Sequence, residues 1–548
     1  MNSSATSFFN YFKKYKNKSI NLKTCLLLGT IVLIVSNLFL FQQISHSDEI
    51  EYALTARNIA FKGEISSNLY ITESIIKNGG FDRPFHMPGF STLVAVFFKI
   101  FGVNDYIALL PNFLLYLTSI AIFYFLSKEL LDKNIKARNL SIVLFILFPV
   151  FWLYTNMVMT EISIVFLCLL FFYLLIKLKN NYTKPIILAV ILIIGMFFRE
   201  TFGLLLWPVI GSLCIYNKEN RLRNIIIFSL VFLALFFTLY LPIFSADRQI
   251  YPNNFNIINS WDTFYKKLWG LKENFLFNFD KATTLRIINS EDLLKFSYWL
   301  IAFFTLLSYN KYCDEKQKRF FWLFFPIFII NILLLFLFYS VLNRIETRIL
   351  LWFIPFLLIY FSIFLENYLS KLNNKEIKKM VLISGLFIIF LSVDIISVIQ
   401  MKNKIEREYK EQSLISQMID KNIEAYNPQV IVSPYTFLYA WQNYPIKIIW
   451  HPPKNIEELK KLEKIIKIDF FIFSKNCDMI FLEETNLKKF SYCEIPYKNK
   501  ILEYLDIQNY LLSNPDKYSL LATDEATFDY TKYEKCNQKF YFFKVNKK

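Results

Sequence analysis

Long apolar runs are the feature that most limits what this chain can fold into. Runs of about 18 or more apolar residues recur from the N-terminus to about residue 400. As α-helices, such runs are long enough to cross the hydrocarbon core of a bilayer, which is about 30 Å thick. The sequence therefore predicts a polytopic α-helical membrane protein with about 11 transmembrane helices. The predicted spans are Leu22–Phe41, Tyr106–Leu126, Leu140–Tyr154, Glu161–Leu178, Pro185–Phe198, Phe202–Tyr216, Ile225–Phe244, Leu293–Leu307, Phe320–Val341, Leu350–Phe364 and Met380–Ile399.

The positive charge of the chain is concentrated in short loops between these spans. The formal net charge is +17, a value that nucleic-acid-binding proteins also reach. Here, however, lysine and arginine follow the positive-inside pattern of cytoplasmic loops, where they also contact anionic membrane lipids. The pattern argues against a nucleic-acid partner. It predicts a cytoplasmic N-terminus at residues 1–23, ahead of a transmembrane domain at residues 24–400.

The predicted orientation depends on two apolar segments. Cys25–Phe41 is long for the core of a signal peptide and no small-residue cleavage site follows it, so we expect a retained first helix. Phe90–Phe101 follows Pro88 and is too short to span a bilayer, which predicts a helix lying at the membrane interface. With this choice the basic loops share the cytoplasmic side. The first outer loop, residues 45–104, then faces the opposite side.

The tail at Met401–Lys548 differs from the rest of the chain because it is polar. A helix predicted at Glu457–Ile466 lies among short runs with strand character, which favours a small α/β domain outside the membrane. The pairing among its three cysteines, Cys477, Cys493 and Cys536, stays open. The predicted strands are Val430–Val432, Ile446–Trp450, Phe470–Phe473 and Phe540–Val545.

Two adjacent carboxylates, Asp48 and Glu49, follow the first predicted span. Charged groups at the edge of a membrane span are costly to desolvate and often mark a functional site. An alanine-rich helix is predicted to begin here and to end at Gly63, so Asp48 could also act as a helix N-cap. The same loop closes with Arg83 and His86.

Other ionisable residues lie at the ends of later spans that the predicted topology places on the same side. They occur in Met159-Thr160-Glu161, in Arg199-Glu200-Thr201 and in the turn Asn343–Arg348. Several helix ends carrying ionisable residues are typical of a site at the membrane surface.

These motifs, taken in order, resemble those of the GT-C superfamily of glycosyltransferases. The closest resemblance is to the family-39-like enzymes, which include protein mannosyltransferases and the aminoarabinose transferases of lipid A. The acidic pair, the short helix ending at glycine and the Pro-Gly break carry the first part of it. The later part rests on Met159-Thr160-Glu161, Phe198-Arg199-Glu200-Thr201 and Glu346–Leu351 with Pro355. The resemblance extends from Leu22 to Phe364.

The chain also departs from the family pattern. Glu161 stands where the family more often has aspartate. Before Pro88 the chain has His86-Met87, where aminoarabinose transferases carry Glu-Lys-Pro. In the late motif, Ile349 replaces a tyrosine. These departures leave the donor sugar open.

The resemblance implies a membrane enzyme that moves a sugar from a polyprenyl-phosphate donor to a lipid, glycan or protein acceptor. We expect it to act at the outer face of a bacterial plasma membrane. Two other function classes remain as alternatives. A transporter would show paired halves with helices broken at the midplane, whereas here the ionisable residues lie at span ends. A multi-spanning polysaccharide polymerase or ligase is the second, against which the early acidic pair argues.

Within that expectation each candidate residue has a role. Asp48 is the candidate general base, with Glu49 beside it in the catalytic set. Guanidinium groups match phosphate oxygens, which favours Arg199 and Arg348 for the leaving phosphate, although each arginine could instead extend its head group to the interface. A divalent metal held by Asp48 and His86 stays open as an alternative, and no other cofactor is expected. The substrate-binding candidates are Arg83, His86, Glu161, Arg199, Arg344 and Arg348.

Overall fold

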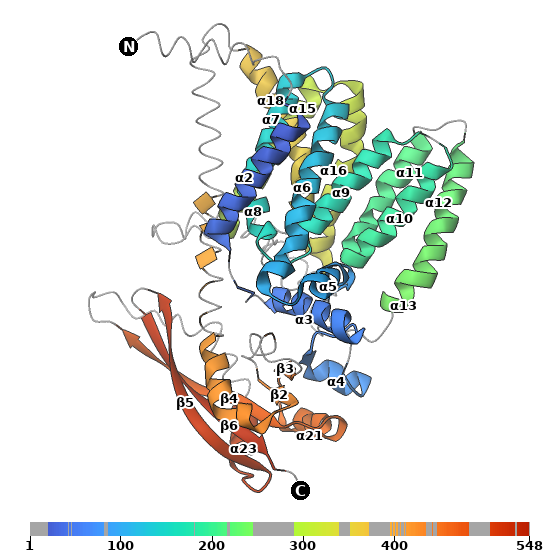
Figure 1. Ribbon diagram of the computed structural model, residues 1–548. Coiled ribbons are helices and arrows are strands. Elements are labelled where there is room, and N and C mark those ends of the chain that lie inside the picture. The colour runs from blue at the N-terminus through green and yellow to red at the C-terminus, as the bar shows by residue number, and fades with distance from the viewer. Residues whose placement is uncertain are drawn as a thin grey trace, which may run out of the picture. The chain divides into compact units, whose positions relative to one another are not determined.

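The computed structural model (Figure 1) describes most of the membrane helices and most of the tail. The described residues are 20–41, 43–44, 47–81, 86–179, 181–215, 220–244, 290–338, 351–371, 413–433, 446–481, 505–531 and 534–546, with isolated positions between 395 and 441. They fall into two compact units. We call the first the helical unit; its described residues fall within Met1–Phe41, Leu109–Ile243 and Asn253–Asn403. The described residues of the second, the sheet unit, fall within Gln42–Ala108, Phe244–Pro252 and Lys404–Lys548.

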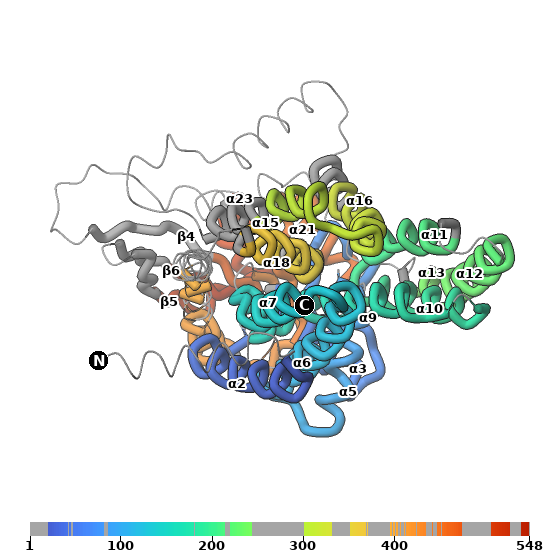
Figure 2. The backbone as a smooth tube through the Cα atoms, turned by 90° about the horizontal axis from the view of Figure 1, so that it is seen from above, coloured from blue at the N-terminus to red at the C-terminus, as the bar shows by residue number. Residues whose placement is uncertain are grey.

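The helical unit is a bundle of apolar helices that coincide with the predicted spans wherever the spans are described. Viewed along the bundle (Figure 2), α18 packs against α7 and α15, and α10 packs against α9 and α12. The predicted span Met380–Ile399 and the predicted outer loop at 245–292 lie almost entirely outside the described residues. The elements are α2 (Leu22–Leu40), α6 (Asp105–Leu130, whose first turn lies in the sheet unit), α7 (Ile135–Leu147), α8 (Pro149–Thr155), α9 (Glu161–Lys177), α10 (Thr183–Phe198), η1 (Glu200–Leu205), α11 (Leu206–Ile215), α12 (Arg221–Leu235), η2 (Phe236–Tyr240), α13 (Leu241–Phe244), α15 (Ser290–Tyr312), α16 (Glu315–Phe338), η4 (Leu351–Phe353) and α18 (Ile354–Lys371).

Helix length does not by itself establish the predicted number of spans. Among the described residues, 4 helices are long and apolar enough to cross a membrane, or up to 5 if α7 and α8, bent by 42° at a break, form one span. Helices such as α10, with 16 residues, rise only about 24 Å and fall short of a bilayer core of about 30 Å. The multi-pass class is therefore supported, while the count of about 11 stays a prediction.

The sheet unit is built on one six-stranded mixed sheet in the order β1-β3-β2-β4-β6-β5. The first four strands in that order run parallel, and β6 and β5 add antiparallel strands beside β4. The strands are β1 (Leu69–Ile71), β2 (Val430–Val432), β3 (Lys447–His451), β4 (Phe470–Phe481), β5 (Tyr518–Thr531) and β6 (Glu534–Val545), with η5 (Glu424–Tyr426), α21 (Ile456–Ile465) and α23 (Leu505–Leu512) between them.

The tail predictions are largely confirmed at the level of individual elements. The predicted strand Val430–Val432 is β2, and the other three predicted strands lie on β3, β4 and β6. The predicted helix at Glu457–Ile466 is α21, which Asn455 caps by accepting a hydrogen bond from the N–H of Glu458 at 2.9 Å. β4 and β6 continue well past their apolar cores because each pairs with the other along its whole length.

One strand of the sheet, β1, comes from residues 45–104, the segment predicted to be the first outer loop, rather than from the tail. Leu69 pairs with Ile448 of β3 in parallel register. Tyr70 and Ile75 are buried in the same hydrophobic core as Val432 and Phe471. Residues 45–104 and the tail are predicted as separate regions, but the structure gives their described residues one sheet and one core.

The same segment supplies three helices: α3 (Ser47–Lys62), α4 (Thr72–Asn78) and α5 (Gly89–Phe101). α5 has 13 residues, a rise of about 20 Å, which is too short to cross a bilayer. It packs against α3 through Phe90 and neighbouring residues, and it leaves Ile100 exposed. This two-sided helix agrees with the segment predicted to lie at the interface.

Candidate functional site

The first candidate cluster is built on the N-terminal turns of α3. The helix begins at Ser47, so Asp48 and Glu49 lie inside its first turn, where carboxylates interact favourably with the helix dipole. The N-cap interpretation requires Asp48 to precede the helix. Asp48 instead lies inside it. Asp48 and Glu51, three residues apart, share a face of the helix.

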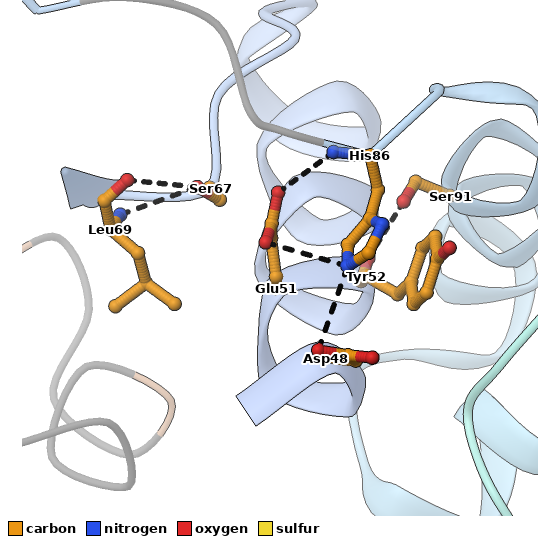
Figure 3. Close-up of polar contacts among 7 residues, drawn as sticks. All are labelled: Asp48, Glu51, Tyr52, Ser67, Leu69, His86 and Ser91. Carbon is orange, nitrogen blue, oxygen red and sulfur yellow. Dashed lines mark hydrogen bonds and ion pairs between the residues drawn. The ribbon is translucent and has the colours of Figure 1, made fainter. Parts of the chain in front are cut away.

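His86 lies against this face, three residues before α5 begins (Figure 3). Its backbone N–H donates a hydrogen bond to Oε1 of Glu51 at 3.1 Å. Its Nε2 lies 3.7 Å from Oδ1 of Asp48 and 3.7 Å from Oε2 of Glu51. The structure thus brings together Asp48 and His86, two predicted site residues from opposite ends of one predicted loop.

Aromatic contacts fix the plane of the His86 ring. Tyr52 stacks on it with a centroid separation of 4.6 Å and an interplanar angle of 19°. Phe90 meets Tyr52 edge-on at 5.5 Å, and the Ser91 hydroxyl donates to the backbone carbonyl of Tyr52 at 3.0 Å. The start of α5 therefore holds Tyr52, and Tyr52 in turn limits how His86 can rotate.

Asp48 and Glu49, the two carboxylates of this turn, differ in their exposure to solvent. The side chain of Asp48 is 20% exposed and that of His86 21%, whereas Glu49 as a whole residue is only 4% exposed. The contacts with His86 come from Asp48 and Glu51, so Glu51 is the group that sequence reasoning missed. The spacing of three between Asp48 and Glu51 was visible in the sequence, but it had no meaning before the position of His86 was known. The catalytic role predicted for Glu49 stays a prediction.

This arrangement can perform proton transfer at Asp48, which is reachable from solvent and faces an imidazole. The alternative, a divalent metal between Asp48 and His86, would draw on the same two side chains. Within the described ranges, no group of three or more His, Cys, Asp or Glu residues is arranged to hold a metal ion. A metal held by Asp48 and His86 stays a prediction.

The second candidate cluster lies in the helical unit, at the start of α9. Glu161 is the first residue of the helix and its side chain is only 3% exposed. Nη1 of Arg199 lies 3.6 Å from Oε1 of Glu161, while Oε2 is buried and makes no hydrogen bond to the described part of the chain. Two predicted substrate-binding residues thus contact each other.

Local packing explains why Arg199 lies at this turn. α10 ends at Phe198, and Arg199 is in an extended conformation before η1 reverses the chain. The ring of Phe202 packs directly on Gly195, where a Cβ would lie 2.0 Å from the ring. A glycine one turn before the end of α10 therefore permits the tight reversal that carries Arg199.

Asn112 of α6 holds the turn that precedes Glu161. Its Nδ2 donates to the carbonyls of Met157 and Met159 at 2.7 and 3.0 Å. Asn112 is fully buried in an apolar helix, and this isolated polar residue was the available clue to its role.

The remaining predicted site residues, Arg83, Arg344 and Arg348, lie outside the described residues. Their roles stay predictions.

Comparisons with known proteins identify the fold. The family model described as dolichyl-phosphate-mannose-protein mannosyltransferase matches residues 82–243. ArnT from Cupriavidus metallidurans, solved with undecaprenyl phosphate, matches 94% of this chain and 97% of its own, with a TM-score of 0.52 at 10% identity. AglB from Archaeoglobus fulgidus, an oligosaccharyltransferase solved with an inhibitory peptide and a dolichol-phosphate, matches 84% of this chain and 70% of its own, with a TM-score of 0.52 at 11% identity. The chain has a GT-C fold. No curated protein matches the sequence.

The GT-C fold confirms the resemblance that the motifs indicated. The matched residues 82–243 contain His86, Glu161 and Arg199. They do not contain Asp48 or the late motif, so assignments there rest on the geometry and on the order of the motifs.

Proposed function

We propose that this GT-C protein is a membrane glycosyltransferase that uses a polyprenyl-phosphate-linked sugar as donor. Two solved structures with this fold, ArnT and AglB, hold undecaprenyl phosphate and a dolichol-phosphate. The matching family model names a dolichyl-phosphate sugar as well. The acceptor is a lipid, a glycan or a protein.

The observation that carries the proposal is the position of Asp48. It stands in the first turn of the first helix after α2, is reachable from solvent and faces the His86 imidazole. Asp48 takes the proton from the acceptor hydroxyl or amine as that group attacks the anomeric carbon. The bond from this carbon to the phosphate oxygen breaks, and the lipid phosphate leaves with the bonding electrons. One base is sufficient for this inverting transfer because phosphate is a good leaving group.

The leaving phosphate gains negative charge, so a guanidinium contact would stabilise the transition state. Arg199 and Arg348 are our candidates for this contact. One guanidinium nitrogen of Arg199, Nη1, faces Glu161. A guanidinium group carries N–H donors on three nitrogens, so Arg199 can also donate to a phosphate.

A transfer assay with purified protein tests the function. We expect release of free polyprenyl phosphate and formation of a glycosylated acceptor when one of a panel of defined polyprenyl-phosphate sugars is supplied. The matching nucleotide sugars, without the lipid, should give no product. Running each reaction with and without a chelator addresses metal dependence. Movement of the lipid-linked sugar across a vesicle membrane without any glycosidic product would instead support the transporter alternative.

We also propose that the protein lies in the plasma membrane of a bacterium with its N-terminus in the cytoplasm and its tail outside. Single cysteines at positions 135 and 460, in a variant lacking the seven native cysteines, test this orientation. An impermeant thiol reagent applied to intact cells should label Lys460→Cys, and Ile135→Cys only after the cells are opened. Labelling of both positions from the same side would overturn the assigned topology.

A further inference from the structure

Glu51 uses its two carboxylate oxygens in different ways. Oε1 accepts a hydrogen bond from the backbone N–H of His86 at 3.1 Å. Oε2 lies 3.7 Å from Nε2 of the same residue (Figure 3). The first contact fixes where the returning chain meets α3, and the second bears on the imidazole itself.

The imidazole of His86 is confined on several sides. Tyr52 stacks on its ring, and the carboxylates of Asp48 and Glu51 both face Nε2 at 3.7 Å. This distance exceeds that of a hydrogen bond, but catalytic contacts are often long without substrate and shorten in the reacting complex. A shift of less than 1 Å would bring Nε2 within hydrogen-bond distance of either carboxylate.

We propose that Glu51 is a positioning residue for transfer, acting on Asp48 through His86. This inference rests on the proposed function, with Asp48 as the base. Glu51 and Asp48 face the same Nε2, which carries at most one N–H, so Glu51 influences where the imidazole lies relative to the Asp48 carboxylate. A displacement of about 1 Å at a reacting group can lower a rate by about 10²-fold, so a modest loss of this restraint has a measurable cost.

A purely structural role for Glu51 makes a different prediction from a positioning role. Glutamine keeps an oxygen that can accept from the backbone N–H of His86, and it has nearly the same shape. Glu51→Gln therefore preserves the tether between α3 and the returning chain. It removes only the negative charge that faces the imidazole.

The experiment is a double-mutant cycle on kcat with Glu51→Gln and His86→Gln, using the full-length protein in the transfer assay. We expect Glu51→Gln alone to lower kcat about tenfold with KM changed less than about twofold. In the His86→Gln background the same substitution should cost less than about twofold, since the imidazole through which it acts is absent. Thermal melting should show all three variants folded.

Glu64→Gln is the matched control, because it removes an exposed carboxylate from the same loop. It should leave kcat unchanged. Unchanged kcat in Glu51→Gln, or losses that multiply in the double variant, would overturn the inference. If this happens while Asp48→Asn abolishes transfer, only the positioning role fails. Retention of transfer by Asp48→Asn would instead remove the base assignment on which the inference rests.

Discussion

Asp48→Asn is expected to lower transfer by on the order of 10²-fold or more while the protein stays folded. Asparagine has nearly the shape of aspartate, and the favourable interaction of the Asp48 carboxylate with the helix dipole that it loses is worth only about 0.3–1 kcal/mol. It cannot take a proton from the acceptor. If Asp48 only stabilised the start of α3, the substitution would cost little activity, so the size of the loss separates the two roles.

Turnover of purified, detergent-solubilised variants measures this effect, with thermal melting as the check on folding. Glu49→Gln is the internal comparison, because Glu49 is buried in the same helical turn. It should cost less than Asp48→Asn. Similar losses at both positions would favour a shared metal, and wild-type turnover for Asp48→Asn would move the proton transfer to Glu49 or Glu161.

The candidate site was partly predictable because its residues lie in short, recognisable segments. Asp48 and His86 are ionisable residues near the two ends of one predicted loop, and the structure places Nε2 of His86 3.7 Å from Oδ1 of Asp48. Glu51 was missed because three-residue spacing on a helix is common and gains meaning only with a third group opposite it. Contact between Glu161 and Arg199 was equally hidden, since it depends on how α9 and α10 pack.

In the fold, too, elements set by nearby residues are predictable from the sequence, whereas elements set by distant partners are not. Helix positions follow from apolar runs, which is why α9 begins at Glu161 as the predicted span does. β1 was not predicted, because three residues carry no detectable alternation and its partner Ile448 is distant in the sequence. Pairing of this kind is decided by the shared core that contains Tyr70 and Val432.

Arg199→Ala is expected to destabilise the protein strongly, because it removes the cation beside a buried carboxylate. The Glu161 side chain is only 3% exposed and Arg199 lies 3.6 Å away. Breaking a fully buried pair by removing one partner typically costs about 3–5 kcal/mol in unfolding free energy, and because Arg199 is 21% exposed we expect a loss toward the lower end of that range. Glu161→Gln removes the buried charge instead and should cost less. The double variant Arg199→Ala, Glu161→Gln should therefore be more stable than Arg199→Ala alone.

Activity in the same double variant decides what else Arg199 does. Thermal melting of the native protein, the two single variants and the double variant measures how much the Arg199–Glu161 pair stabilises the fold. The transfer assay on the same four proteins measures catalytic activity. If Arg199 also contacts the leaving phosphate, the double variant regains thermal stability but not turnover, because glutamine at position 161 cannot replace the guanidinium. Turnover that returns together with stability would limit Arg199 to neutralising Glu161. A melting temperature of Arg199→Ala equal to that of the native protein would show that the buried carboxylate does not need this partner.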